Sequence, residues 1–234
     1  MHKDRIAIIG IGCRFPGGVH DAESFWKLLV ERRDAVTDVP ADRWNVERYY
    51  DPEPGIAGKT FAKRAGFLDQ IDKFDPQFFG ISPREAPYVD PQHRLLLETS
   101  WEAIENAGVV LDFENGSDIA VFVGISHNDY QGIQSTAFDH FGITPHTATG
   151  SAHSIAANRI SYCLNLRGPS VAMDTACSSA LTAIHTACEH IWAGRGDTAL
   201  AGGVTAPPRR QGLCRLAPFP AFPASLLGRL QQPR

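Results

Sequence analysis

The sequence predicts an α/β protein built around a buried sheet, and three observations support this prediction. Short apolar or β-branched runs, several of them ended by glycine, alternate with longer segments whose apolar residues recur at helical spacing. Strands that alternate with helices are typical of α/β folds with buried sheet strands. With 43% hydrophobic and 21% charged residues over 234 positions, the chain has the composition of a globular protein large enough to bury a core.

The first 88 residues are expected to contain one strand, one helix and a long irregular excursion. Residues 6–10 form a β-branched run that ends at glycine, as buried strands often do. Asp21 is a candidate N-cap for a helix. The apolar face of that helix consists of Phe25, Trp26, Leu28 and Leu29. Residues 34–88 contain several prolines and little periodicity, so we expect loops and short elements in a surface or interface layer.

The middle of the chain has the clearest helical signal. Asp90 is a candidate N-cap, Pro91 stands at the first helical position, and Gly108 is placed to end the helix. The apolar positions between them recur at helical spacing: Leu95, Leu96, Thr99, Ala103, Ile104 and Ala107. Residues 119–123 are then expected to form a second buried strand that ends at Gly124.

The alternation continues to about residue 204. Residues 150–163 predict a helix, and a Gly-Pro turn at 168–169 leads into a third strand at 170–173. Residues 178–192 predict a helix with an apolar stripe, and residues 200–204 begin a fourth strand. We see no internal repeat, and no amphipathic pattern after this strand.

Several classes of protein are excluded by composition. The apolar run at residues 6–13 is far too short to span a bilayer, and no cleavage site follows it, so we expect a cytoplasmic protein. The five cysteines form no C-x-x-C pair, and their odd number argues against a disulfide framework. His185 and His190 are five residues apart, which is not the spacing of a zinc-binding helix, so we expect no metal site.

The last 30 residues differ from the rest of the chain. Residues 205–234 contain five Arg, no Asp, Glu or Lys, and six of the 16 prolines, whereas the net charge of the whole chain is −4. Proline at this density does not suit a sheet strand, because it cannot donate ladder hydrogen bonds. We therefore expect an acidic body at 1–204 and a Pro/Arg-rich tail at 205–234.

Cys177 is the candidate nucleophile. It lies in a very short turn between a buried strand and a helix, where unpaired N–H groups and the helix dipole stabilise a negatively charged sulfur. Small neighbours leave room for a substrate carbonyl, so the arrangement is similar to a nucleophile elbow with Cys in place of Ser. The alternative is a buried structural cysteine. That alternative is favoured for Cys188, which lies on the apolar stripe, and Cys13 and Cys163 carry no nucleophile signal.

Two other binding functions are disfavoured. The Gly10-x-Gly12 pair follows a strand as in dinucleotide-binding proteins, but the third glycine is out of register and Pro16 blocks an immediate helix. The arginines of the tail lack lysine and interleaved stacking aromatics, so they are a weak footprint for nucleic acid.

Four blocks of the sequence stand in a characteristic order. They are IAIIGIGCRFPGG at 6–18, DPQHRLLLE at 90–98 with WEA at 101–103, AANRISY at 156–162 followed by GPS at 168–170, and DTACSS at 174–179. These blocks resemble the opening, the characteristic helix, the lead-in to the nucleophile and the active-site cysteine motif of β-ketoacyl synthase domains, especially those of type I polyketide synthases. The resemblance covers residues 5–204.

The resemblance implies the N-terminal half of a thiolase-like layered α/β sandwich, a fold that normally dimerises. It also implies an acyltransferase in which Cys177 takes an acyl chain from acyl carrier protein as a thioester. Decarboxylation of a malonyl-type extender then yields the carbanion that attacks this thioester. The backbone N–H of Cys177 would contribute to the oxyanion hole. The implied partners are acyl carrier protein and other polyketide synthase domains, and substrates arrive on a phosphopantetheine arm with no bound cofactor.

The chain departs from the family pattern after Val204. The family uses two histidines from motifs in its second half, and after Cys177 this sequence has only His185 and His190, both inside the following helix. We expect these two to be solvated or packing residues, and the chain to be truncated and defective in condensation. A shifted reading frame in the tail and a genuine Pro-rich linker both remain open. The rival functions are a non-catalytic fragment or dimerisation module, and a condensing enzyme that acts on coenzyme A thioesters.

Overall fold

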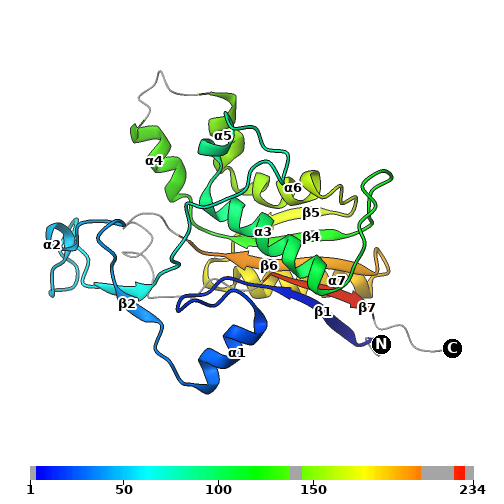
Figure 1. The fold of residues 1–234 in the computed structure, drawn as a ribbon, viewed down its shortest axis with the longest axis horizontal. Coiled ribbons are helices and arrows are strands. Elements are labelled where there is room, and N and C mark those ends of the chain that lie inside the picture. Colours follow the sequence, from blue (N-terminus) through cyan, green and yellow to red (C-terminus); the bar gives the residue numbers. More distant parts are fainter. Residues whose placement is uncertain (1–3, 138–143, 207–223, 230–234) are drawn as a thin grey trace.

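The computed structural model describes residues 4–137, 144–206 and 224–229 (Figure 1). The strands are β1 (Ile6–Gly12), β2 (Val36–Asp38), β3 (Arg64–Gly66), β4 (Ala120–Ile125), β5 (Ser170–Met173), β6 (Thr198–Val204) and β7 (Ala224–Arg229). The α-helices are α1 (Ala22–Val30), α2 (Val46–Tyr49), α3 (Pro91–Asn106), α4 (Asp129–Ala137), α5 (Pro145–Ser151), α6 (His153–Cys163) and α7 (Ser179–Trp192), with 3₁₀ turns η1 (Ala86–Tyr88) and η3 (Ala176–Ser178).

Five strands form one mixed sheet in the order β1-β7-β6-β4-β5 (Figure 1). Strand β4 pairs in parallel with β5 and β6, whereas β7 runs antiparallel to both β1 and β6. Helices α3 and α6 pack on one face of this sheet and α7 packs on the other. The predicted α/β class is therefore confirmed.

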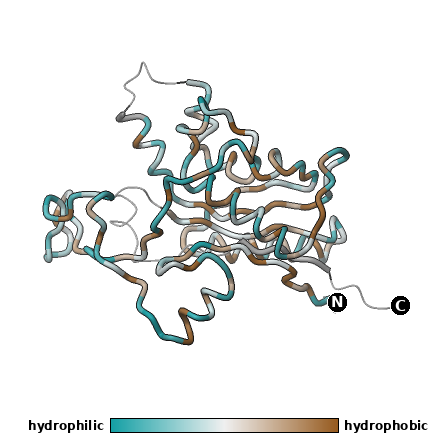
Figure 2. Tube along the Cα trace, in the orientation of Figure 1, coloured by the Kyte–Doolittle hydropathy of each residue, from teal (hydrophilic) through white to brown (hydrophobic). Residues whose placement is uncertain are grey.

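Strand β4 shows how the two faces are filled. Val121 and Val123 belong to the core shared with α3 and α6, whereas Ala120 and Phe122 belong to the core under α7. Side chains alternate between faces along a strand, so a strand covered on both sides must be apolar at every position. All six residues of β4 are buried, and the apolar trace along the central strands is visible in Figure 2.

Strand β7 was not expected. No sheet strand was predicted beyond residue 204, yet residues 224–229 pair with β1 from Ile6 to Gly12 and with β6 from Thr198 to Ala201. The prediction from proline density is wrong for this segment, because none of the tail's prolines falls inside it and every backbone N–H can donate. The other tail residues, 207–223 and 230–234, lie outside the described residues.

Two element boundaries also differ from expectation. Strand β4 does not end at Gly124 but continues to Ile125. The single helix expected at 150–163 is two helices, α5 and α6, which meet at Ala152 in an extended conformation (φ −67°, ψ 130°). The predicted caps of α1 and α3 are confirmed: Asp21 accepts from Ser24 N and Asp90 from Gln92 N.

The first part of the chain is the irregular layer that the proline content suggested. Strands β2 and β3 form a separate antiparallel pair, and α1 has no buried residue. Within the described residues, no helix has both the length and the apolar character needed to cross a membrane.

Helix α3 buries polar groups at its start, and this predicts an acid-sensitive fold. His93 is buried with no hydrogen-bond partner for either ring nitrogen among the described residues, and burial lowers its pKa from 6.5 to about 3. The unfolded chain takes up this proton near pH 6.5 but the folded chain does not. His93 therefore lowers the free energy of unfolding by up to about 1.4 kcal/mol per pH unit as the pH falls from 6.5 towards 3.

Replacement of His93 by Met is expected to reduce the loss of unfolding free energy between pH 6.5 and pH 3. Urea unfolding at pH 7, 5.5 and 4 should show the variant losing less stability than the native chain across this range. Buried Asp90, whose pKa burial raises to about 6, changes stability in the opposite direction but is present in both proteins. Identical pH profiles for the two proteins would contradict the assignment.

Candidate active site

Cys177 lies where β5 runs into α7. Strand β5 ends at Met173, the 3₁₀ turn η3 holds Cys177 at its centre, and α7 begins two residues later at Ser179. Cys177 is exposed. The candidate nucleophile thus lies beside a helix start, in the short turn that the sequence predicted.

Local hydrogen bonds define the shape of this turn. Asp174 Oδ1 accepts from Ala176 N at 2.9 Å, Thr175 N donates to Ser179 Oγ at 2.9 Å, and Ser179 Oγ donates to Ala176 O at 2.7 Å. The Ala176 N–H, followed by the Ser126 hydroxyl, holds the pKa of Asp174 below its usual value, so this acceptor stays ionised. Ala176 has φ of +56°, a left-handed conformation that costs a non-glycine residue about 1–2 kcal/mol. The turn is a strained elbow held by its own side chains.

Two glycines allow α7 to start close against the sheet. A Cβ on Gly124 of β4 would lie 2.5 Å from the carbonyl carbon of Ser179, and one on Gly203 of β6 would lie 2.7 Å from Ala180 Cβ. No real Cβ tolerates such contacts. Position 124 of the strand therefore needs glycine, because the backbone of the first turn of α7 lies directly against it.

Ser126 connects the end of β4 to the same turn. Its hydroxyl lies 3.1 Å from Ser179 Oγ. Strands β4 and β5 are parallel neighbours, so their carboxyl ends meet at one edge of the sheet. This edge brings together Ser126 after β4 and residues 174–179 after β5.

The other described cysteines lie in packed surroundings. Burial raises the pKa of Cys13 to about 11 and raises that of Cys163, whose Sγ donates to Phe79 O at 3.4 Å. Cys188 packs against the core under α7, as expected from the apolar stripe. Cys214 lies outside the described residues.

His185 and His190 lie where solvated or packing residues were expected. Both lie on α7, His185 exposed and His190 buried with its ring 5.7 Å from that of Phe122. Two other histidines, His127 and His153, were not predicted to lie near the site, yet His153 Nε2 lies 3.0 Å from the backbone oxygen of His127, the residue after Ser126. His127 is the second residue after β4, and the rule that parallel strands end at one edge could have placed it here.

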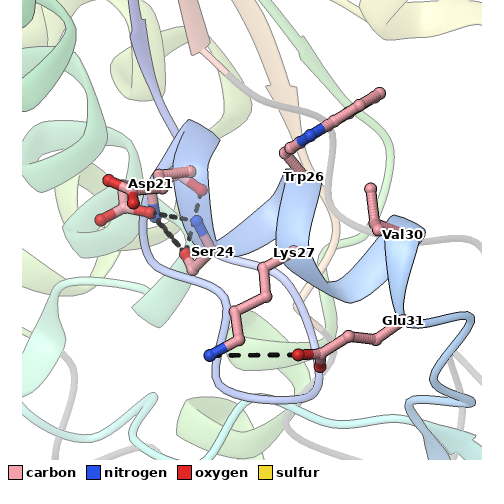
Figure 3. A pocket seen from close by; sticks show the side chains of 7 residues that line it. Asp21, Ser24, Trp26, Lys27, Val30 and Glu31 are labelled. Carbon is pink, nitrogen blue, oxygen red and sulfur yellow. Dashed lines mark hydrogen bonds and ion pairs between the residues drawn. The ribbon is translucent and has the colours of Figure 1, made fainter.

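The described residues around the turn offer nothing that would hold a metal ion. In this part of the chain, no group of three or more His, Cys, Asp or Glu is arranged as a set of ligands. An open hollow on the exposed side of α1 is lined by Trp26, Lys27, Val30 and Glu31 together with Asp21, Glu23 and Ser24 (Figure 3). No predicted site residue lines it.

A match to a known protein family identifies the family that has this fold and this cysteine-bearing turn. The family model described as "Beta-ketoacyl synthase, N-terminal domain" matches residues 3–223. The chain belongs to the beta-ketoacyl synthase family. It spans the N-terminal part of a ketosynthase domain of the polyketide synthase type, so the resemblance to this acyltransferase family is confirmed. The family match extends past Val204, where the sequence resemblance was expected to end.

Curated relatives are polyketide synthases. The chain is 49% identical over 200 residues to a phenolphthiocerol/phthiocerol polyketide synthase of Mycobacterium tuberculosis, covering 86% of this chain and 13% of that protein. It is 48% identical over 200 residues to a mycocerosic acid synthase-like polyketide synthase of Mycolicibacterium smegmatis, covering 86% of this chain and 9% of that protein. The ketosynthase chain thus spans a small part of these relatives.

Solved ketosynthases share the fold. An oxazolomycin ketosynthase domain from Streptomyces albus matches with a TM-score of 0.84 and 36% identity, over 97% of this chain and 43% of that one. A ketosynthase from module 6 of the bacillaene synthase of Bacillus subtilis matches with a TM-score of 0.83 and 34% identity, over 96% and 40%. The α/β fold of this ketosynthase chain is therefore the thiolase-like fold of the N-terminal half of such domains.

Proposed function

We propose that Cys177 accepts an acyl chain from the phosphopantetheine arm of acyl carrier protein as a thioester. The observation that supports this best is the exposed sulfur on a strained turn at the start of α7, in a chain of the ketosynthase family. In the complete reaction, this thioester is the electrophile for decarboxylative condensation with a malonyl-type extender, as in polyketide and fatty-acid biosynthesis.

The acylation step is a thioester exchange. The Cys177 sulfur attacks the carbonyl carbon of the arm's thioester and forms a new C–S bond. The tetrahedral intermediate then breaks its bond to the arm's sulfur, which leaves as a thiol with the proton given up by Cys177. The backbone N–H of Cys177 is proposed to donate to the developing oxyanion, where preorganised donors act most strongly.

The proposed partners follow from this chemistry. Acyl carrier protein supplies the substrate, other polyketide synthase domains supply and receive the chain, and the intact domain works as a homodimer. We propose that no bound cofactor or metal takes part, because the thioester itself is the activated group. We also propose that the reaction takes place in the cytoplasm.

The acylation proposal is tested on the purified 234-residue chain. The probe is an acyl N-acetylcysteamine thioester, which copies the end of the phosphopantetheine arm, and intact-mass spectrometry follows the adduct. One acyl group per chain is expected, and it should be released by hydroxylamine, which cleaves thioesters. A folded chain that acquires no acyl group would refute the proposal.

Condensation by these 234 residues is not expected. Decarboxylation and condensation in this family use two histidines from second-half motifs, whereas His185 and His190 of this chain lie along α7. With acyl donor and malonyl carrier protein both present, mass spectrometry should show acylated chain but no β-ketoacyl product. Detection of such a product would overturn the proposal that this chain is defective in carbon–carbon bond formation.

A non-catalytic interaction module is the second candidate, and exposed apolar groups favour it. Leu181 on α7 is 61% exposed and Val171 on the edge strand β5 is 41% exposed. Exposed apolar patches often mark interfaces. Size-exclusion chromatography with an unfolding curve separates the candidates: a cooperatively folded chain that accepts an acyl group supports the acyltransferase, and association without acylation supports the module.

A further inference from the structure

Two side chains from different helices converge on one carbonyl oxygen next to the candidate site. Gln92 Nε2 of α3 donates to His127 O at 2.8 Å, and His153 Nε2 of α6 lies 3.0 Å from the same oxygen. A carbonyl oxygen can only accept, so His153 must carry its proton on Nε2 and act as a donor. Both lone pairs of this carbonyl are thus used by helices that lie outside the turn bearing Cys177.

Gln92 is held firmly in place. It is fully buried, its backbone N–H donates to Asp90 Oδ1 at 2.8 Å, and Asp90 N in turn donates to Gly150 O at 2.7 Å. The donor to His127 is therefore anchored both at the N-terminus of α3 and at the end of α5. The side-chain amide nitrogen also lies 3.4 Å from Asp90 Oδ2, whereas Gln92 Oε1 has no partner among the described residues, so the nitrogen contacts fix the orientation of this amide.

Ser126, the residue before His127, contacts the turn that holds Cys177. Ser126 Oγ lies 3.1 Å from Ser179 Oγ, and its hydroxyl helps to keep Asp174 ionised by lowering the pKa of that carboxyl. The Ser179 hydroxyl accepts from Thr175 N and donates to Ala176 O, and the Asp174 carboxylate accepts from Ala176 N. A continuous path of hydrogen bonds and one peptide link therefore runs from Gln92 and His153 to the two residues before Cys177.

We propose that Gln92 and His153 are positioning residues for Cys177, acting through the His127 carbonyl and Ser126. No hydrogen bond among the described residues joins either side chain to Cys177, so the role that we assign to them is to hold the loop that braces the turn. This inference rests on the proposal that Cys177 is the acyl acceptor, but its test uses the chemical reactivity of the sulfur and not acyl transfer.

The test measures alkylation of Cys177 by iodoacetamide, with glutathione in the same reaction as reference thiol and mass spectrometry as readout. Gln92→Met keeps the side-chain length and removes the donor, and His153→Leu removes the second donor. Each is expected to lower the Cys177 rate relative to glutathione by about fivefold, the factor typical of one lost hydrogen bond. His153→Gln keeps an N–H donor and should restore most of the rate, which a merely structural role would not require.

The control is Gln70→Met in the exposed loop after β3, which makes the same chemical change and should leave the ratio unchanged. His153 is only partly buried, so its pair of variants decides the matter if Gln92→Met does not fold. An unchanged or faster Cys177 rate in folded His153→Leu, or no rescue by His153→Gln, would overturn the proposal. Loss of acyl transfer with normal alkylation in the native chain would instead count against the proposed function alone.

Discussion

Replacement of Cys177 by Ala is expected to abolish acylation of the chain completely. The step needs a sulfur that can reach a thioester carbonyl, and Cys177 is the exposed thiol among the described cysteines. Burial holds the pKa of Cys13 and Cys163 above the usual value, which keeps those thiols protonated and unreactive. Intact-mass spectrometry after incubation with an acyl thioester should show no added mass in this variant.

The matched control for this experiment is Cys188→Ala. Cys188 lies on the same helix but packs against the core under α7, so its loss should leave the adduct in place. Circular dichroism should show both variants folded, because alanine fits an exposed turn and a helix interior alike. Acylation that persists in Cys177→Ala and vanishes in Cys188→Ala would identify Cys188 as the acylated residue and contradict the proposal.

The second large effect is expected at Gly124, where a single methyl group should destabilise the fold. In Gly124→Ala the new Cβ would lie 2.5 Å from the carbonyl carbon of Ser179 and 2.6 Å from Ala180 N. Both are backbone atoms, so rotation of a side chain cannot relieve the clash, and α7 must move away from β4. Overpacking of this kind costs about 2–3 kcal/mol, and the shift should also slow alkylation of Cys177 because the turn moves with the helix.

Gly132→Ala in α4 is the paired control. An added Cβ at this position meets no atom within 4 Å, and alanine is the better helix former by up to about 1 kcal/mol. Urea unfolding should therefore give a lower midpoint for Gly124→Ala and an equal or higher midpoint for Gly132→Ala, with the same slope. Equal midpoints for Gly124→Ala and the native chain would show that α7 does not rest on this glycine.

Local chemistry predicted many of the elements around the site. Helix α3 begins at Pro91 after Asp90, as its capping pattern required, and Gly108 follows its end with φ of +64°. Strand β5 and helix α7 were predicted to within one residue, because the turn between them is too short to permit another arrangement. The exposed Cys177 followed from the same two elements.

Long-range pairing and close backbone contact were not predictable in this way. Strand β7 depends on a partner on each side, β1 and β6, and a six-residue stretch in a proline-rich tail carries no periodicity that reveals them. Gly124 was interpreted as the end of a strand because glycine usually punctuates sequence, whereas it is needed for contact with α7. Gly150 was interpreted as the start of one helix, whereas it lies in the last turn of α5, two residues before the break at Ala152.

In the candidate site, too, local sequence marks some residues, and others are brought together only by the fold. Cys177 is marked by its own neighbours, but Gln92, His127 and His153 come from three separate elements and meet only through the fold. Their residue types carry no signal by themselves, and His127 contributes only its backbone carbonyl, a group that every residue has. The family resemblance identified the segment that contains Gln92 without assigning this residue a task.

The most direct test of the central proposal is to locate the acyl group on the chain. The native protein is incubated with an acyl N-acetylcysteamine thioester, digested at low pH to preserve thioesters, and mapped by tandem mass spectrometry. We predict one acyl group, on the peptide that contains Cys177 and on its sulfur. An acyl group on any other residue, or none on a chain that is folded and alkylates at Cys177, would contradict the proposal.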